Sequence, residues 1–326
     1  MTDERTTTAG GSSESLLTVL VALVANVLIA IAKTIAAMLT GSASMVAESA
    51  HSWADSGNEV LLLVAERRSR KPADARRPLG YGKDAYIWSM FAAFGLFAVG
   101  AAVSITHGIT ELLDPEPASD YVIAYVVLAI SFVLEGVSFT RAYLQTRRSA
   151  RARGVSTLAR VLHHSDPTLR AVFAEDAAAL IGLLIAGAGV GLHQATGSPV
   201  PDAIGSILVG VLLGVVAIIL IARNRDFLLG ESVDLPTRDA VLAGLLANEG
   251  IERVTSLRIQ YLGPGTVSVV AAVDLAGNAP EDDVAYTLRR LEQEIAANPH
   301  VGLAVLTLSA PDEPSVHPGD PVVPQL

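Results

Sequence analysis

The chain has 326 residues, of which 51% are hydrophobic and only 17% are charged, with a formal net charge of −10. Soluble domains carry about a quarter charged residues, so this composition indicates a membrane protein. The acidic balance argues against a nucleic-acid partner, and the absence of cysteine excludes disulfides and thiolate metal ligands.

The first 14 residues are polar and lack the basic region and cleavage site of a signal peptide, so we expect a disordered tail. A membrane-spanning helix needs roughly 20 mostly apolar residues. Six later segments meet this requirement and predict an all-α, six-helix transmembrane domain over residues 15–226. The segments are Leu16–Leu39, Ala47–Ala65, Ala85–Leu112, Tyr121–Leu144, Leu169–Leu192 and Ile204–Ile221.

The loops between these segments differ in charge. Arginine and lysine cluster between the second and third segments and between the fourth and fifth. The loops at the opposite ends, Thr40–Met45, Asp114–Asp120 and His193–Asp202, contain neither residue. Because cytoplasmic loops are enriched in basic residues, we expect both termini to lie in the cytoplasm.

The second segment carries a polar stripe on an apolar helix. His51, Asp55 and Asn58 are three or four residues apart and therefore share one helix face. An imidazole and a carboxylate one turn apart can form half of a divalent-metal site. A structural ion pair is the alternative, but ionisable residues inside a span are costly and commonly mark a transport path. We therefore predict that His51 and Asp55 bind metal and that Asn58 hydrogen-bonds Asp55.

Other ionisable residues lie within or beside the spans. We expect Lys33 in the first segment to neutralise a carboxylate such as Glu135 or Glu175, and Glu135 in the fourth to pair across helices or lie on a proton path. His163, His164 and Asp166 precede the fifth segment on the cytoplasmic side. They could capture metal at an entrance, or they could be ordinary surface residues.

The sequence after the last span changes character. Pro236–Asn248 and Pro280–Ala297 are predicted helices, and Val254–Leu262, Thr266–Leu275 and Val301–Leu308 are predicted strands. This α-β-β-α-β order predicts a small cytoplasmic α+β domain over residues 227–310. Residues 311–326 contain repeated prolines and are expected to form a disordered tail.

Several motifs, in this order, resemble the cation diffusion facilitator family. They are the His-x-x-x-Asp of His51 and Asp55, RRPLGYGKDAYIW with Arg77 where the family usually has histidine, DAIGSILVG from Asp202 to Gly210, and Leu228–Glu231. The resemblance implies a transporter rather than an enzyme. It also implies exchange of divalent metal for protons, and a homodimer paired through a metallochaperone-like soluble domain.

The fifth span departs from the family pattern. If Gly182 is matched to the family's glycine, Asp176 takes the place of the second metal ligand and Val172 takes the place of the first. The adjacent Glu175 could substitute, although neighbouring helix residues point about 100° apart. The Glu-Asp pair, together with the second span, looks like the zinc transporter nine-like branch. The resemblance implies a metal site of His51, Asp55, Asp176 and Glu175.

We therefore predict a metal/proton antiporter that works by alternating access and exports Zn²⁺, or Mn²⁺, Fe²⁺ or Co²⁺, from the cytoplasm. It would need no cofactor besides the transported metal, and we expect it in the lipid bilayer of the plasma membrane. Two alternatives stay open. The absent ligand at Val172 is compatible with a non-transporting metal-sensing regulator, and the same metal could activate water in an intramembrane metalloenzyme.

Overall fold

A computed structural model of the chain describes residues 10–115, 120–152, 156–162 and 164–320. The described residues form two compact units. One contains the chain up to Ala65 together with Trp88–Asn224, and the other contains Glu66–Ile87 together with the chain from Arg225 onward. Each unit is therefore built from two separate stretches of sequence.

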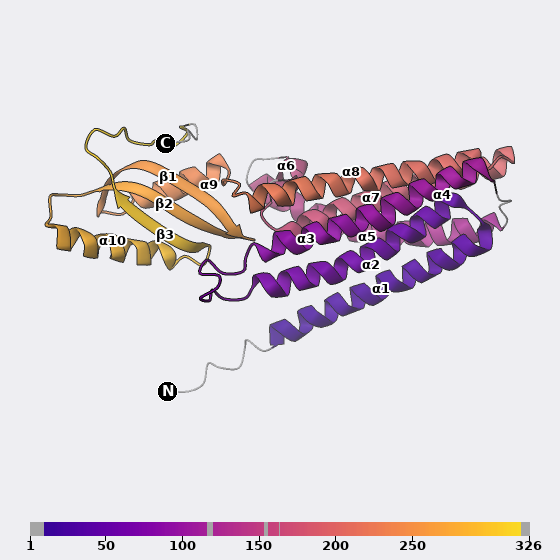
Figure 1. The fold of residues 1–326 in the computed structure, drawn as a ribbon, viewed down its shortest axis with the longest axis horizontal. Coiled ribbons are helices and arrows are strands. Elements are labelled where there is room, and N and C mark those ends of the chain that lie inside the picture. Colours follow the sequence, from indigo (N-terminus) through magenta and orange to yellow (C-terminus); the bar gives the residue numbers. More distant parts are fainter. Residues whose placement is uncertain (1–9, 116–119, 153–155, 163, 321–326) are drawn as a thin grey trace. The chain divides into compact units, whose positions relative to one another are not determined.

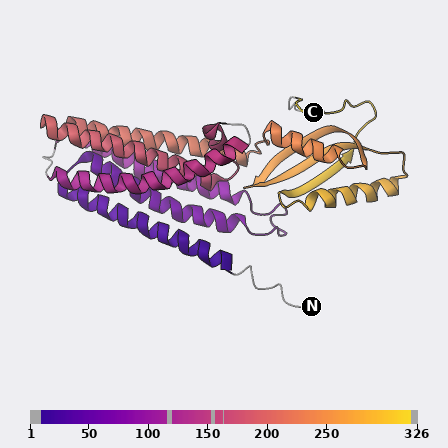
Figure 2. The ribbon, with the colours of Figure 1, turned by 180° about the vertical axis from the view of Figure 1, so that it is seen from behind.

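The first unit is a bundle of long helices that run side by side, as the two opposite views show (Figures 1 and 2). α1 begins at Gly10, inside the stretch that we expected to be a disordered tail. The helices are α1 (Gly10–Thr40), α2 (Ala43–Ser69), α3 (Asp84–Gly95), the π-helix η1 (Leu96–Ala101), α4 (Ala102–Leu113), α5 (Tyr121–Ala152), α6 (Thr157–Leu162), α7 (Pro167–Thr196) and α8 (Val200–Leu228).

Within the described residues, five helical stretches are long and apolar enough to cross a membrane. They are Leu23–Thr40, Asp84–Leu113, Tyr121–Arg148, Pro167–Thr196 and Val200–Leu228. The sequence predicted a sixth span in α2, which is not among them. At 27 residues α2 is about 40 Å long, which suffices to cross a bilayer, but its composition is too polar for this criterion.

α2 lies against several other helices through small apolar residues. Ala47 and Ala54 share one buried cluster with Ala178 of α7 and with Val209 and Leu213 of α8. Leu62, further along α2, packs in a second cluster with residues of α3, α7 and α8. Glu48, His51 and Asn58 of α2 are therefore buried inside a helical bundle.

The Asp-x-x-x-Ser-x-x-x-Gly motif of α8 has a packing role in this bundle. Ser44 at the start of α2 donates its hydroxyl to the backbone carbonyl of Asp202, with an Oγ–O distance of 2.9 Å. Ser206 donates to the carbonyl of Ser104 in α4 at 2.9 Å. A Cβ on Gly210 would lie 2.9 Å from the carbonyl oxygen of Ala101, so only glycine allows this approach. The motif thus fixes α8 against α2 and α4.

The third apolar segment is interrupted by the π-helix η1, although the sequence predicted one continuous helix. The π-helical stretch adjoins α8, because a Cβ on Gly100 would lie 2.9 Å from Cδ1 of Leu213. π-Helical turns depend on tertiary packing and commonly lie at functional sites. The apolar pattern gives no signal for this change of helix type.

The second unit contains a three-stranded sheet with strand order β1-β2-β3. Its elements are α9 (Leu235–Leu246), β1 (Ile251–Gly263), β2 (Thr266–Leu275), α10 (Glu281–Ala296) and β3 (Val301–Leu308), in the order expected from the sequence. β1 and β2 form an antiparallel hairpin, and β2 and β3 are parallel, joined through α10. Leu242 and Leu291, one from each helix, and Val269 of β2 are fully buried in its core.

The loop between α2 and α3 belongs to this second unit, which the sequence did not indicate. A Cβ on Gly82 would lie 2.6 Å from the carbonyl oxygen of Leu262 and 2.9 Å from Cα of Gly263, so the two backbones touch. Lys83 donates to the carbonyl of Leu228 at 3.2 Å. Tyr86 stacks on Phe227 with ring centroids 5.1 Å apart. The GYGKDAY stretch therefore holds the loop onto the hairpin and the end of α8.

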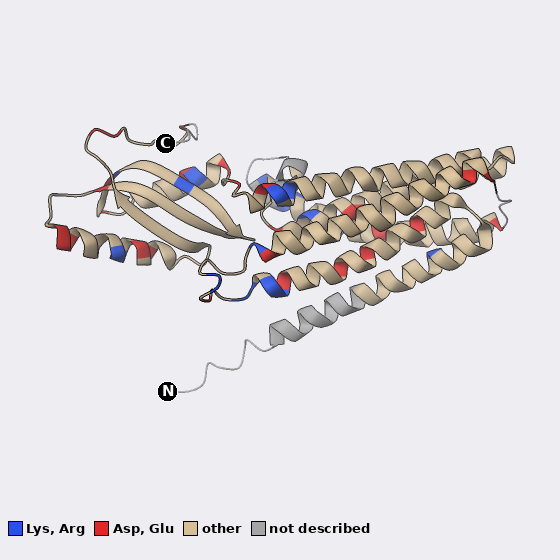
Figure 3. Ribbon diagram, in the orientation of Figure 1, with Lys and Arg blue, Asp and Glu red and all other residues tan. Residues whose placement is uncertain are grey.

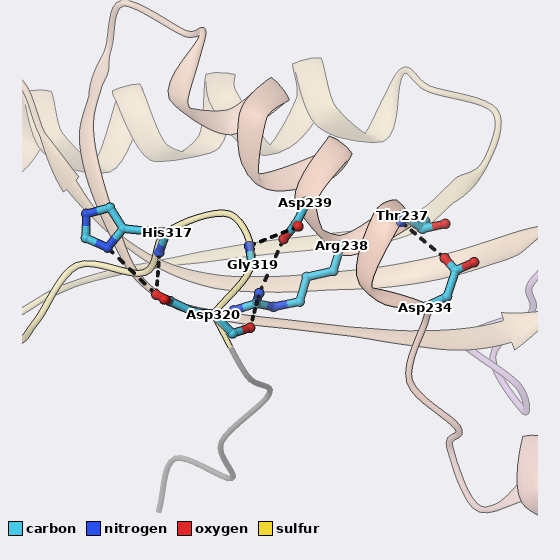
Figure 4. Close-up of polar contacts among 7 residues, drawn as sticks. All are labelled: Asp234, Thr237, Arg238, Asp239, His317, Gly319 and Asp320. Carbon is cyan, nitrogen blue, oxygen red and sulfur yellow. Dashed lines mark hydrogen bonds and ion pairs between the residues drawn. The ribbon is translucent and has the colours of Figure 1, made fainter. Parts of the chain in front are cut away.

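Residues 309–320, after β3, lie along the same unit, although we expect residues 311–326 to be disordered. Residues 321–326 lie outside the described part of the chain. Figure 4 shows two of the contacts. Arg238 of α9 donates to the carbonyl of Asp320 at 3.1 Å, and the amide of Gly319 donates to the carboxylate of Asp239 at 3.0 Å. The amide of Val316 also donates to the carbonyl of Val254 at 2.8 Å. Backbone hydrogen bonds of this kind depend on the fold and leave no composition signal.

Candidate functional site

The candidate site is centred on the polar face of α2. Glu48, His51, Asp55, Asn58 and Glu59 recur at helical spacing, and Figure 3 shows acidic residues in red along this helix. His51 is fully buried, and neither of its ring nitrogens has a hydrogen-bond partner among the described residues. Its Nδ1 lies 3.4 Å from Oδ1 of Asp55. Metal binding by this imidazole stays a prediction.

The two acidic residues of α7 face different neighbours. Glu175 is buried, and its Oε1 accepts a hydrogen bond of 3.1 Å from Nδ2 of Asn58 on α2. Asp176 accepts a hydrogen bond of 2.8 Å from Ser138 on α5. α7 runs without interruption from Pro167 to Thr196, so no local unwinding brings the two carboxylates together. Asn58 thus contacts Glu175, whereas we expected it to contact Asp55.

A cavity of about 400 Å³ opens beside this face, between α1, α2, α5 and α7. Five carboxylates and one amide contribute to its lining. They are Asp55 and Glu59 of α2, Glu135 of α5, Glu175 and Asp176 of α7, and Asn26 of α1. Val172, which stands where the family's first ligand of the fifth span is expected, also lines the cavity. A ligand at position 172 would have faced the same space as Asp176.

Lys33 has a different partner from the one that the sequence indicated. Its ammonium lies 2.9 Å from Oε2 of Glu48, and both side chains are fully buried. We had expected Glu135 or Glu175 to be the partner. Both of those carboxylates line the cavity instead, and Glu175 is bound by Asn58. The expectation was wrong because Glu48 was not recognised as part of the polar face of α2.

The charges around Asp55 are mostly negative. Its carboxylate interacts electrostatically with Glu175, Glu135 and Asp176, as well as with Lys33. Three acidic groups against one basic group in an apolar bundle attract cations strongly, because the low dielectric weakens screening. In the conformation of the described residues, however, no three His, Asp or Glu side chains are close enough to hold one metal ion. Binding would require side chains to converge.

The residues before α7 have structural roles in the described part of the chain. Asp166 caps α7 by accepting a 2.9 Å hydrogen bond from the amide of Thr168, and Nδ1 of His164 accepts one of 3.0 Å from the amide of Asp166. His163 lies outside the described residues. Capture of metal by His163, His164 and Asp166 stays a prediction.

Comparison with known proteins identifies the helical unit. The family described as the cation efflux transmembrane domain matches residues 19–229. That match covers more than half of the chain. The chain belongs to the cation efflux family. The resemblance seen in its motifs is thereby confirmed, and the protein is a membrane protein with several apolar helices.

Three named relatives of this cation efflux protein differ in how similar they are to it. The human "Proton-coupled zinc antiporter SLC30A9, mitochondrial" is 38% identical over 260 residues, covering 79% of this chain and 46% of the relative. "Metal tolerance protein C4" of Arabidopsis thaliana is 36% identical over 233 residues, covering 72% and 51%. "Magnetosome protein MamB" of Paramagnetospirillum magneticum is 24% identical over 242 residues, covering 74% and 76%. The chain thus spans about half the length of the first two relatives.

Two site features of this cation efflux protein escaped the sequence analysis. Glu48 is fully buried against Lys33, and Glu59 lines the cavity and accepts a hydrogen bond of 3.1 Å from Asn26. The helical spacing of Glu48, His51, Asp55 and Glu59 could have identified both residues.

Proposed function

We propose that the protein is a secondary transporter that exchanges Zn²⁺ for protons across a membrane. The observation that carries this proposal is the acidic cavity, which is lined by carboxylates of α2, α5 and α7. One of them, Asp55, lies 3.4 Å from the buried imidazole of His51. The human relative is named a proton-coupled zinc antiporter, which agrees with this chemistry. Mn²⁺, Fe²⁺ and Co²⁺ are secondary candidates, since oxygen ligands favour them.

The proposed ligands are His51, Asp55, Glu175 and Asp176. One nitrogen and three oxygens suit tetrahedral Zn²⁺. His51 and Asp55 are already adjacent, and Asn58 holds Glu175 against the same helix. Binding would draw Glu175 toward Asp55 by a change of side-chain conformation, and Asp176 would follow if it releases Ser138. The metal here is the transported substrate and not a resident cofactor.

Proton exchange follows from competition for the same atoms. Metal binding requires a neutral imidazole and ionised carboxylates, so metal and protons exclude one another from these groups. If the site faces each side of the membrane in turn, a proton gradient then drives metal in the opposite direction.

The topology of the chain is part of the proposal. We propose six spans, with α2 as the sixth because its polar face is buried among other helices. The arginine-rich loops would lie in the cytoplasm with both termini, and metal would enter from that side. The second unit would act as a metallochaperone-like dimerisation domain in a homodimer. We propose that the protein lies in the plasma membrane. Because the human relative is named mitochondrial, a localisation experiment should compare the plasma membrane with mitochondria.

The test is flux in proteoliposomes that contain the purified full-length protein. We expect an imposed pH gradient to drive Zn²⁺ uptake, and we expect collapse of the gradient with an ionophore to stop it. Asp55→Asn should remove the flux, whereas Ser56→Ala should retain it, because the hydroxyl of Ser56 donates to the carbonyl of Ser52 in its own helix at 2.9 Å. Zn²⁺ binding without flux would support the regulator instead. Metal-dependent proteolysis without flux would support the metalloenzyme.

A further inference from the structure

The ion pair between Lys33 of α1 and Glu48 of α2 has no assigned function. Its Nζ–Oε2 distance is 2.9 Å, and both side chains are fully buried. A buried pair of this kind costs about as much in desolvation as it returns in attraction, so stability alone is a weak reason for it. Ionisable residues inside a membrane bundle more commonly serve a transport path. The pair therefore calls for a role beyond packing.

Glu48 is built into its position. A Cβ on Gly182 of α7 would lie only 2.7 Å from Oε1 of Glu48, so the missing side chain of this glycine makes room for the carboxylate. That oxygen has no hydrogen-bond partner among the described residues. Lys33 is thus the principal compensation for the charge of Glu48, and Glu48 in turn determines where the ammonium of Lys33 lies.

The pair adjoins the proposed metal site. Glu48 precedes His51 by three residues on the same face of α2. The charge of Lys33 reaches His51, Asp55 and Glu135. A lysine is a compact charge on a flexible stem of four carbons, so its ammonium can be drawn to any carboxylate in reach. Asp55 and Glu135, the two acidic residues among these, face the cavity and would be the alternative partners without Glu48.

We propose that Glu48 is a positioning residue that keeps the ammonium of Lys33 away from Asp55 and Glu135, and so sets the net charge that the transported cation meets. While Lys33 is held by Glu48, the pair is neutral and the cavity carboxylates remain negative. If Lys33 were released, its ammonium would neutralise one of them and compete with the metal. This inference rests on the proposed function, since it concerns affinity at the same site.

The proposal predicts effects of opposite sign for the two halves of one ion pair. Lys33→Met leaves an extra negative charge beside the site and should tighten Zn²⁺ binding about tenfold. Glu48→Gln frees the ammonium and should weaken binding about tenfold. The double variant restores a neutral pair and should bind close to the wild-type affinity. If the pair had only a structural role, both single variants would bind Zn²⁺ more weakly than the wild type, and the double variant would regain the wild-type affinity.

The measurement is calorimetry of Zn²⁺ binding to full-length protein in lipid nanodiscs at one neutral pH. Ser49→Ala is the matched control, because Ser49 joins the same two helices through an uncharged hydrogen bond of 2.7 Å to Thr34. It should leave the affinity within about twofold of wild type. If Lys33→Met fails to insert, Lys33→Gln makes the same charge change while keeping a hydrogen bond to Glu48, and it carries the same expectation.

Measurements of Zn²⁺ flux distinguish a positioning role of Glu48 from a general loss of function. Lys33→Met should lower both the KM and the maximal rate of Zn²⁺ flux, because tighter binding slows release. Glu48→Gln should raise the KM with little change in the maximal rate. Weakened binding in both single variants, or unchanged binding in both, would overturn the proposal. An absence of pH-driven flux in the wild type would overturn the proposed function instead, and the affinity comparison would still judge the ion pair.

Discussion

Asn58 of α2 donates a hydrogen bond of 3.1 Å to Glu175 of α7, and both side chains are buried. This bond joins the helix that carries His51 and Asp55 to the helix that carries the remaining acidic candidates. It also distinguishes the two acidic residues of α7, because Asp176 contacts Ser138 of α5 instead. The bond therefore bears directly on which carboxylate meets the metal first.

Glu175 and Asp176 should contribute unequally to metal binding. The sequence favours Asp176 through its spacing from Gly182, whereas the structure puts Glu175 on the side of α2. We expect Glu175→Gln to weaken Zn²⁺ affinity about a hundredfold, as loss of a charged ligand does, and Asp176→Asn to weaken it about tenfold. Calorimetry on the two variants measures this difference. A greater loss in Asp176→Asn would favour the sequence alignment and would require Asp176 to turn away from Ser138.

Asp55→Ala should abolish pH-driven flux while leaving the protein folded and inserted. Its carboxylate faces the cavity among several other acidic groups, and its Oδ1 has no hydrogen-bond partner among the described residues. Removing one of several like charges from an apolar bundle relieves repulsion, so the thermal midpoint should stay unchanged or rise. Size-exclusion profiles and thermal melts check the fold, and liposome flux checks function. Flux at the wild-type rate would show that the proposed site is wrong.

The sequence predicted the elements of the structure well where a short-range pattern specifies them. Strand alternation and turn residues gave β2 as Thr266–Leu275 and β3 as Val301–Leu308, the bounds that the structure has. Helical spacing likewise put His51 and Asp55 on one face. Such patterns depend on residues near one another in the chain, so they can be interpreted without tertiary contacts.

Most of the missed features depend on contacts between different segments of the chain. The partner of Lys33 is 15 residues away, and the partner of Asn58 is 117 residues away. The contact of Gly82 with Gly263 joins two parts of the chain that no periodicity relates. The π-helix η1 has an ordinary apolar sequence. Pairing of buried charges in particular depends on packing, because several partners at similar distance compete for each charge.

The second unit should need the segment after β3 for full stability. Glu313 contacts β1 from this segment, accepting hydrogen bonds of 2.5 Å from Arg253 at its carbonyl and 2.9 Å from Thr255 at its carboxylate. We expect a fragment of residues 231–320 to fold and to dimerise weakly. Its free energy of unfolding should exceed that of a fragment of residues 231–310 by about 2 kcal/mol. Urea denaturation followed by circular dichroism compares the fragments, and sedimentation equilibrium measures dimerisation. Equal stability of the two fragments would mean that the segment after β3 does not pack against β1 in solution.

Tyr81 and Asp74 in the loop between α2 and α3 should titrate as a linked pair. The phenol of Tyr81 donates to Asp74 at 2.7 Å. This hydrogen bond lowers the pKa of Asp74 below its usual value and raises the pKa of Tyr81 above its usual value. The lowered pKa of Asp74 stabilises the fold above the unfolded-state value, and this contribution is lost as pH falls through the lowered pKa. The raised pKa of Tyr81 stabilises the fold below its unfolded-state value, and this contribution is lost as pH rises through the raised pKa.

Ultraviolet absorbance measures this linkage. The difference between wild type and Tyr81→Phe isolates the phenolate of Tyr81 during an alkaline titration. Its midpoint should lie above that of a free tyrosine, and Asp74→Asn should return it toward the free value because the anionic acceptor is gone. An unchanged midpoint in Asp74→Asn would mean that the two side chains do not meet in solution.

Gly82→Ala should loosen the loop between α2 and α3 from the rest of the second unit. The added Cβ would lie 2.6 Å from the carbonyl oxygen of Leu262 and 2.9 Å from Cα of Gly263. Both atoms belong to the backbone of the β1–β2 hairpin, so neither can move aside as a side chain would. Overpacking of this kind costs about 1–3 kcal/mol, and the loop can avoid it only by separating from the hairpin. The loop carries a run of arginines and lysines from Arg67 to Lys83, so trypsin should then cleave it faster than in the wild type.

Gly244→Ala in α9 is the matched control, because it adds the same methyl group in the same unit. A Cβ there would meet nothing within 4 Å among the described residues, and alanine favours a helix over glycine by about 0.5–1 kcal/mol. This variant should therefore leave tryptic cleavage of the loop unchanged and raise the thermal midpoint slightly. Cleavage rates and thermal melts of the two full-length variants make the comparison. Equal cleavage of Gly82→Ala and wild type would mean that the loop is not docked on the hairpin, and the aromatic contact of Tyr86 with Phe227 would then have to form without it.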